Sequence, residues 1–163
     1  MAVDWSICNV AHTPAGDGEA LMRIADVLRT KGPVVHTVRS DARVAELVTL
    51  LDEHNVGALV VVDGDAVAGI VSERDVVRLL AGTGPALLDA PVSSIMSASV
   101  TTCSPGDTVD EVMAVITERR FRHLPVLVDG KLGGIVSIGD MVSAKMRDLE
   151  RERAQLESYI SGG

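Results

Sequence analysis

The chain repeats itself at a spacing of 65 residues. Shifting the sequence by this amount aligns residues 35–77 with residues 100–142 without a gap, and thirteen of the 43 aligned positions are identical. The identities are densest where GIVSERD (69–75) matches GIVSIGD (134–140). Self-similarity at a fixed spacing indicates two copies of one structural unit, and it constrains the fold more than any other feature of the sequence.

Each copy predicts the same succession of elements. A short extended segment comes first, an amphipathic helix follows, then two strands joined by an Asp-Gly turn (63–64 and 129–130), and a second helix closes the unit. The predicted ranges are 34–38, 44–54 and 58–72 with a helix from about Glu73 in the first copy, and 99–103, 109–119 and 123–137 with a helix from about Gly139 in the second.

A unit of about 60 residues buries too little of its sheet to be stable alone. We therefore expect a mixed α/β (α+β) fold in which two β-α-β-β-α repeats pack sheet against sheet around a pseudo-twofold axis. That arrangement forms two equivalent clefts. The segment before each repeat does not follow the spacing of 65. Residues 26–28 match residues 94–96 only after a further shift of three. The first copy therefore has a longer loop before its first strand.

The sequence divides into five segments. Residues 1–18 carry no apolar period and predict a flexible arm. The first repeat is expected over residues 19–82, a linker over 83–94, the second repeat over 95–147 and a helical extension over 148–163.

The C-terminal extension carries an apolar spacing of three and four residues. Met146, Leu149, Leu156 and Ile160 follow this spacing, and Arg153 occupies one position within it. A stripe of this kind can be the seam for a partner helix or a dimer. It can equally pack back on its own domain with a solvated charged face outward.

Charge and cysteine content restrict the class of protein. The formal net charge of −8 argues against nucleic-acid binding, since that affinity rests on clustered lysines and arginines. The two cysteines are too few for a disulfide scaffold, and the first 20 residues lack the pattern of a secretory signal. No apolar run reaches membrane length. We expect a soluble, cytoplasmic protein that contacts neither membrane nor nucleic acid.

The repeated heptapeptide combines a strand end, a hydroxyl and a carboxylate at a helix start. Its glycine allows another backbone segment to approach the strand closely. Ser72 and Ser137 fall at a helix N-cap, where hydroxyl and free N–H groups can meet an anion. Asp75 and Asp140 follow in the first turn, where a carboxylate can accept both hydroxyls of a ribose. A capping box is the alternative for one copy. Two copies in register favour a binding site.

The pair of repeats, each closing on G-h-h-S-x-x-D, resembles the tandem CBS-domain (Bateman) module. RHLPVL (122–127) before the second heptapeptide is similar to a second motif of that family, and the match covers about residues 20–147. The resemblance implies an adenine nucleotide bound between the repeats, without a metal. AMP is the ligand we expect, with ATP, ADP, NAD or S-adenosylmethionine as alternatives.

The same resemblance assigns roles to individual residues. Asp75 and Asp140 would bind ribose hydroxyls, with Ser72 and Ser137 beside the ribose or phosphate. Aliphatic strand residues would enclose the base, which suits a chain in which only 2% of residues are aromatic. The implied base pockets contain Val35 and Thr37 in one cleft, and Val100 and Thr102 in the other.

The two copies differ in charge around their motifs. The second has Arg119, Arg120, Arg122 and His123 where the first has His54, Asn55, Gly57 and Ala58, while the first has Arg74 opposite Gly139. Arginines bind phosphates well. We predict that the cleft built on Ser72 and Asp75 is the better nucleotide site, with Arg122 and His123 facing the phosphates. A solvated helix end is the alternative for the arginine cluster.

No catalytic motif is present. The histidines lack zinc-ligand spacing, and neither a G-x-S-x-G elbow nor a Walker A sequence occurs. The sequence therefore predicts that the chain is not an enzyme. The resemblance to the CBS module implies a regulatory nucleotide sensor that forms a homodimer and acts on an unidentified protein partner. The alternative is an interaction module whose nucleotide clefts are vestigial.

Overall fold

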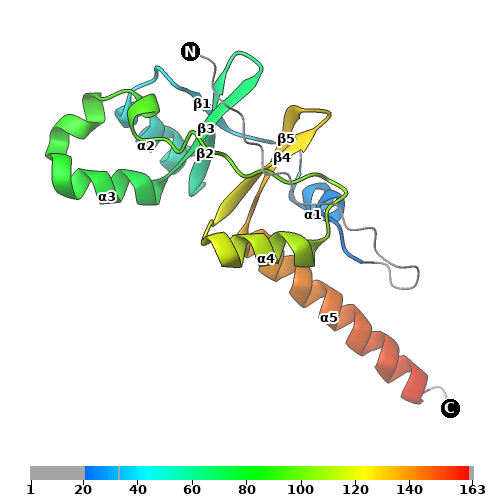
Figure 1. The fold of residues 1–163 in the computed structure, drawn as a ribbon. Coiled ribbons are helices and arrows are strands. Elements are labelled where there is room, and N and C mark those ends of the chain that lie inside the picture. The colour runs from blue at the N-terminus through cyan, green and yellow to red at the C-terminus, as the bar shows by residue number, and fades with distance from the viewer. Residues whose placement is uncertain (1–20, 33, 162–163) are drawn as a thin grey trace.

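The computed structural model describes residues 21–32 and 34–161, so the arm predicted for residues 1–18 lies outside the described part. Figure 1 shows two α/β units side by side, with a long helix leaving the second. This confirms the mixed fold of two repeats predicted from the sequence. The strands β3 and β5, which end in the two heptapeptides, contact each other where the units meet.

The first repeat has the predicted order of elements. They are β1 (Thr37–Arg39), α2 (Val44–Glu53), β2 (Ala58–Asp63), β3 (Ala66–Ser72) and α3 (Glu73–Thr83). The sheet order is β1-β2-β3, with β1 parallel and β3 antiparallel to β2. The hairpin turn falls on Gly64 and Asp65, one residue later than predicted, because Asp63 still pairs with Ala66. Gly64 takes the positive φ (62°) that such a turn requires.

The second repeat is built in the same way except at its first strand. Its elements are α4 (Val109–Arg119), β4 (His123–Val128), β5 (Lys131–Ser137) and α5 (Ile138–Ser161), and its hairpin turns at Asp129 and Gly130 as predicted.

The extended segment predicted over residues 99–103 does not form a regular strand: its bridges are confined to Thr102 and Cys103, and Cys103 pairs with Val126 in parallel. The bonds are Cys103 N–H to Pro125 O (3.0 Å) and Leu127 N–H to Cys103 O (2.9 Å). Pro125 has no N–H to donate to the next residue of the ladder, so the pairing stops there. In the first repeat Val60 holds this position and the ladder continues to Thr37.

Each hydrophobic core is completed by the segment that precedes the other repeat. Helix α1 (Ile24–Lys31) comes before the first repeat, yet Ile24 and Val27 belong to the core of the second. The 3-10 helices η1 (Gly84–Asp89) and η2 (Val92–Ser94), which fill the predicted linker, supply Leu87 and Val92 to the core of the first. The predicted domain boundaries follow the order of the chain, whereas α1 and the two 3-10 helices each pack on the core of the other repeat. The boundaries themselves stay predictions.

Helix α1 and the segment of η1 and η2 each cross to the core of the other repeat, and we call them the crossing segments. Matching backbone hydrogen bonds hold them in place. Ile24 N–H bonds to Asp107 O and Val109 N–H to Met22 O, both at 2.9 Å. In the other repeat, Val92 N–H bonds to Ala42 O (2.8 Å) and Val44 N–H to Ala90 O (2.9 Å). The repeats thus correspond at an offset of 65 and the crossing segments at 68, which agrees with the extra shift of three in the sequence.

The glycine of each heptapeptide lies directly under a crossing segment. A Cβ at Gly69 would stand 2.7 Å from Met96 Sδ and 2.9 Å from Ser97 O, and one at Gly134 would stand 2.6 Å from Leu28 Cδ2. In the first repeat Ile70 and Ser97 also exchange backbone hydrogen bonds of 3.0 and 2.9 Å. The close approach of another backbone segment is confirmed at Gly69, whereas at Gly134 the side chain of Leu28 approaches the strand instead.

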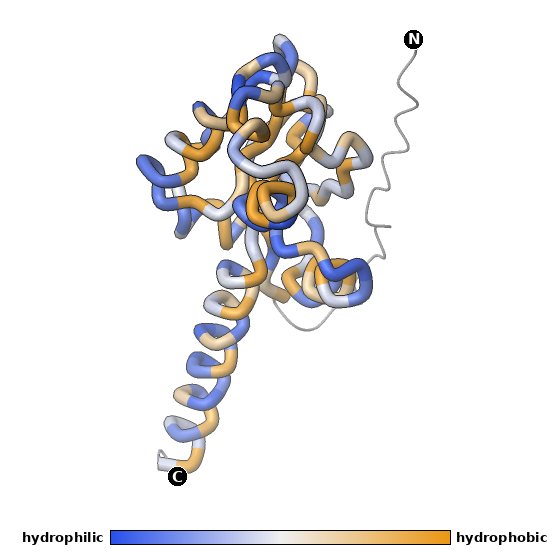
Figure 2. Tube along the Cα trace, turned by 90° about the vertical axis from the view of Figure 1, so that its left-hand side faces the viewer, coloured by the Kyte–Doolittle hydropathy of each residue, from blue (hydrophilic) through white to orange (hydrophobic). Residues whose placement is uncertain are grey.

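Helix α5 leaves the body of the protein after two turns. Only Met141 and Ala144 of its 24 residues are buried, and Figures 1 and 2 show the remainder extending away. Leu149, Leu156 and Ile160 are 54%, 65% and 81% exposed, so the helix does not pack back on its own domain. No helix within residues 21–32 and 34–161 is long and apolar enough to cross a membrane.

Candidate functional site

A cleft of about 680 Å³ lies between the repeats and is bordered by both heptapeptides. Ser72 and Asp75 reach it from the junction of β3 and α3, and Ser137 and Gly139 from the junction of β5 and α5. The hairpins end at this cleft because each heptapeptide stops a strand and starts a helix within seven residues. The structure therefore brings three of the four predicted motif side chains to one place.

Ser72 and Asp75 form a capping box in the wall of the cleft. Asp75 Oδ2 accepts from Ser72 N–H at 2.8 Å and from Ser72 Oγ at 2.6 Å, and Asp75 N–H donates back to Ser72 Oγ at 3.4 Å. Both hydrogen bonds that the carboxylate accepts from the described residues use Oδ2. Asp75 makes no ion pair with any residue in the described ranges. The capping box predicted as an alternative is present, and it holds the carboxylate in the cleft.

Asp140 has the same capping geometry but different surroundings. Its Oδ2 accepts from Ser137 N–H at 2.8 Å and also from Lys31 Nζ at 2.7 Å, and it is absent from the lining of the cleft. Burial opposes its ionised form, yet the hydrogen bonds from Lys31 and Ser137 outweigh burial and lower the pKa of Asp140. Asp140 is thus an ionised, paired carboxylate.

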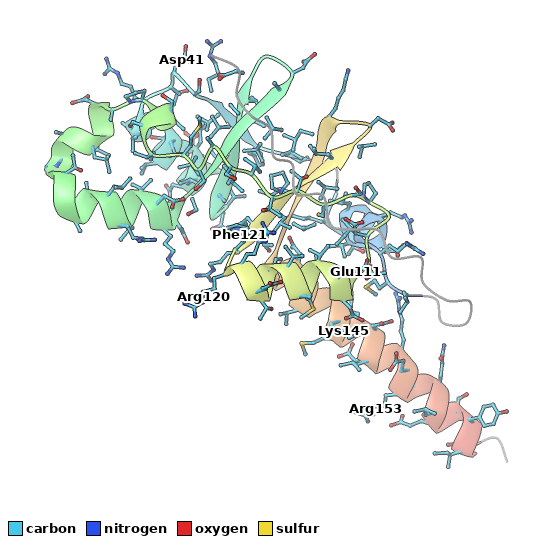
Figure 3. All side chains as sticks on the ribbon, in the orientation of Figure 1. Asp41, Glu111, Arg120, Phe121, Lys145 and Arg153 are labelled. Carbon is cyan, nitrogen blue, oxygen red and sulfur yellow. The ribbon has the colours of Figure 1, made fainter. Side chains whose placement is uncertain are left out.

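Basic side chains from both repeats also line the cleft. Five arginines line it, against the two carboxylates of Glu73 and Asp75. They are Arg74 and Arg78 of α3, and Arg119, Arg120 and Arg122 at and beyond the end of α4. Figure 3 shows Arg120 and Phe121 at the end of α4 that faces the first repeat. In a chain of formal charge −8, this concentration of guanidinium groups favours an anionic ligand.

His123 lies between the two repeats at the start of β4. A Cβ at Gly57 of the first repeat would be only 3.4 Å from His123 Cε1. Burial lowers the pKa of His123 below its ordinary 6.5, and the charges of Lys31 and Arg122 lower it further, partly offset by Asp140 and Glu73. His123 is therefore neutral at pH 7, and an added negative charge would favour its protonation.

The residues predicted to enclose the base lie elsewhere. Val35, Thr37, Val100 and Thr102 do not line this cleft, and Val100 and Thr102 are buried. Ser99 and Thr101 line it instead, because successive side chains of an extended segment point to opposite faces. That alternation is the signal by which the sequence could have identified them. Arg78 and Phe121 were also missed, and the base-binding roles of Val35, Thr37, Val100 and Thr102 stay predictions.

The described residues contain neither a metal-binding cluster nor a reactive thiol. No cluster of three or more His, Cys, Asp or Glu in the described ranges could hold a metal ion. Cys103 is buried, and burial together with the charge of Asp107 raises its pKa to about 12, so it is no nucleophile at neutral pH.

Comparison with known proteins identifies the family. The family model of the CBS domain matches residues 24–82 and 92–147. The chain is 36% identical over 149 residues to the mitochondrial CBS domain-containing protein CBSX3 of Arabidopsis thaliana, covering 86% of this chain and 72% of that protein. It is 42% identical to a CBS-domain containing protein of Agrobacterium tumefaciens, whose crystal structure superposes with a TM-score of 0.74 and covers 76% of this chain and 99% of that one.

A more distant structure shares the fold and carries ligands. The CBS domain pair of protein MJ0100, solved with 5′-methylthioadenosine and S-adenosyl-L-methionine, is 23% identical with a TM-score of 0.70, over 78% of this chain and 98% of that one. The family model matches both repeats, and both structures share the fold. The chain belongs to the CBS domain family and contains two CBS domains in tandem.

Proposed function

We propose that this CBS pair binds an adenine nucleotide in the cleft beside Asp75 and acts as a regulatory sensor without catalytic activity. One observation carries the proposal: the unpaired carboxylate of Asp75 shares a 680 Å³ cleft with five arginines. A carboxylate suits ribose hydroxyls and arginines suit phosphates, so the cleft contains both recognition groups of a nucleotide. The adenosine compounds bound to the CBS pair of MJ0100 support the choice of an adenosine ligand.

Each part of the nucleotide has a complementary part of the cleft. Asp75 Oδ1 accepts ribose hydroxyls while Oδ2 keeps the helix cap. Arg122 and His123 approach the phosphates from the second repeat, and Arg74 and Arg78 from the first. Aliphatic side chains such as Ile70 and Ile138 contact the base. The basic lining of the cleft favours AMP, our first choice, and also ADP, ATP or NAD over the cationic sulfonium of S-adenosylmethionine.

Binding would act on the arrangement of the two repeats. Because the cleft is lined from both repeats, a ligand that contacts both prefers one spacing between β3 and β5 and shifts the population toward it. Ser137, which precedes α5, and Gly139 in the first turn of α5 both line this cleft, so a shift there moves the exposed end of the helix. An unidentified protein partner would respond to that movement. The cytoplasmic location and the independence from metals stay predictions.

A homodimer is part of the proposal. Met146, Leu149, Leu156 and Ile160 are each more than half exposed and follow a spacing of three and four residues. A second copy of α5 would cover this stripe. Light scattering should give a dimer mass for the wild type and a monomer mass for Leu149→Asp/Leu156→Asp, whereas Arg151→Asp on the same helix should remain dimeric. A monomeric wild type would contradict this interface.

Calorimetric titration with AMP tests the nucleotide site. Asp75→Asn keeps an oxygen for the helix cap but removes the charge that accepts ribose hydroxyls, so we expect at least a tenfold loss of affinity. Asp140→Asn makes the same change at the equivalent position and should leave the affinity within about threefold. The reverse order would place the site in the second repeat. If millimolar AMP, ADP, ATP, NAD or S-adenosylmethionine neither binds nor raises the unfolding temperature, the interaction module with vestigial clefts is the better description.

A further inference from the structure

The pseudo-symmetry of the fold gives Lys31 a counterpart in the other repeat. The crossing segments correspond at an offset of 68, as their backbone hydrogen bonds show. The same offset pairs Leu28, which covers Gly134, with Met96, which covers Gly69. At the same offset Lys31, the last residue of α1, falls on Ser99, which lies in an irregular segment outside any helix or strand. Lys31 contacts Asp140, and Ser99 lines the same cleft as Ser72 and Asp75.

These two counterparts have opposite effects on their carboxylates. Ser99 lines the 680 Å³ cleft and leaves Asp75 without an ion pair in the described ranges. Lys31 extends its ammonium group to Asp140 Oδ2 at 2.7 Å and to Ile135 O at 3.0 Å. The side chain of Lys31 is 35% exposed and that of Asp140 is 23% exposed, so the pair lies at the surface with its carboxylate the more shielded partner. A partly shielded carboxylate is screened less than a fully exposed one.

The ammonium group of Lys31 presents the donors that a ribose would present. Two of its three N–H groups reach Asp140 and the strand carbonyl next to it, so a ligand at Asp140 would have to displace both bonds. We propose that Lys31 is an intramolecular occupant of the second site, and that it limits this CBS pair to one nucleotide per chain. The inference rests on the proposed nucleotide binding at Asp75.

An exchange of the two counterparts tests this inference by titration with AMP. The wild type should bind one AMP per chain. Lys31→Ser should bind two, because Asp140 becomes as free as Asp75. Ser99→Lys should lose the first site, because a lysine there can pair with Asp75. Lys31→Ser/Asp140→Asn should return to one AMP per chain, which assigns the new site to Asp140. Unfolding temperatures of all variants verify that each is folded.

The outcomes separate the inference from the proposed function. Two AMP per wild-type chain, or a single AMP per chain in Lys31→Ser, would overturn the role of Lys31 while leaving nucleotide binding intact. A loss of affinity in Lys31→Ser would make Lys31 a ligand of the nucleotide and not its competitor. Absence of AMP binding by both wild type and Lys31→Ser would overturn both proposals. Binding by Lys31→Ser alone would support the role of Lys31 and overturn the site at Asp75.

Discussion

The two repeats are alike in backbone and unlike in the side chains that face their motifs. Asp75 and Asp140 form the same helix cap, yet only Asp140 is paired with a lysine. Beside the cleft, the second repeat has Arg122 and His123 where the first has Gly57 and Ala58. Backbone hydrogen bonds and core packing thus maintain the internal symmetry, whereas side chains outside those bonds can make the two sites functionally different.

The largest effect should come from the shared cores. Leu59 and Leu124 occupy equivalent positions and are both fully buried. Replacing either by alanine should lower the free energy of unfolding by about 2–5 kcal/mol, since the side chain is lost and a cavity remains. Urea unfolding measures this. Equal losses would support equivalent cores, and a difference of more than about 2 kcal/mol would mean that the symmetry of the backbone does not extend to packing.

A smaller effect should separate the two motif glycines. Gly69→Ala places its methyl group against Met96 and the backbone oxygen of Ser97, whereas Gly134→Ala meets only the flexible end of Leu28. Overpacking costs about 1–3 kcal/mol, and we expect Gly69→Ala near the upper end and Gly134→Ala near the lower end. Urea unfolding again provides the measurement. A greater loss of unfolding free energy for Gly134→Ala would show that the segment with Met96 and Ser97 moves more easily than Leu28 to accommodate a methyl group.

Sequence alone predicted most of the fold and about half of the candidate site. The repeat was correct, and its hairpin turns and the two motif helix starts were correct to within one residue, because short local signals determine them: Gly and Asp at turns, and Ser-x-x-Asp at helix caps. Crossing of α1 to the second core was not predicted, because long-range packing leaves no local signal. Lys31 was missed for that reason, since its partner Asp140 lies 109 residues away along the chain. The segment 99–103 does not form a regular strand because Pro125 has no N–H to continue the pairing. This effect of a single residue can be recognised in the sequence.

A pH effect should distinguish the repeats at His123. Folding lowers the pKa of His123, so the unfolded chain binds the proton more readily, and the free energy of unfolding should fall as the pH drops below 6.5. The first repeat has Ala58 at this position. His123→Ala should therefore lose part of the dependence between pH 7.5 and 5.5, measured by urea unfolding at each pH. His54→Ala on the exposed surface is the control. If the free energy of unfolding of His123→Ala changes with pH as steeply as that of the wild type, the pH dependence does not come from His123.

The smallest effect should come from the one buried thiol of the described ranges. Cys103 occupies the position of Val38, since both pair in parallel with equivalent valines. The two side chains are similar in volume, so Cys103→Val and the reciprocal Val38→Cys should each change the free energy of unfolding by less than about 1.5 kcal/mol. Because burial raises the pKa of Cys103 to about 12, its thiol should not react with a disulfide reagent in the native protein. The assay uses a Cys8→Ser background, in which reaction should occur only after denaturant is added. Rapid labelling of the native protein, or a loss of several kcal/mol in Cys103→Val, would mean that this pair of positions is not equivalent after all.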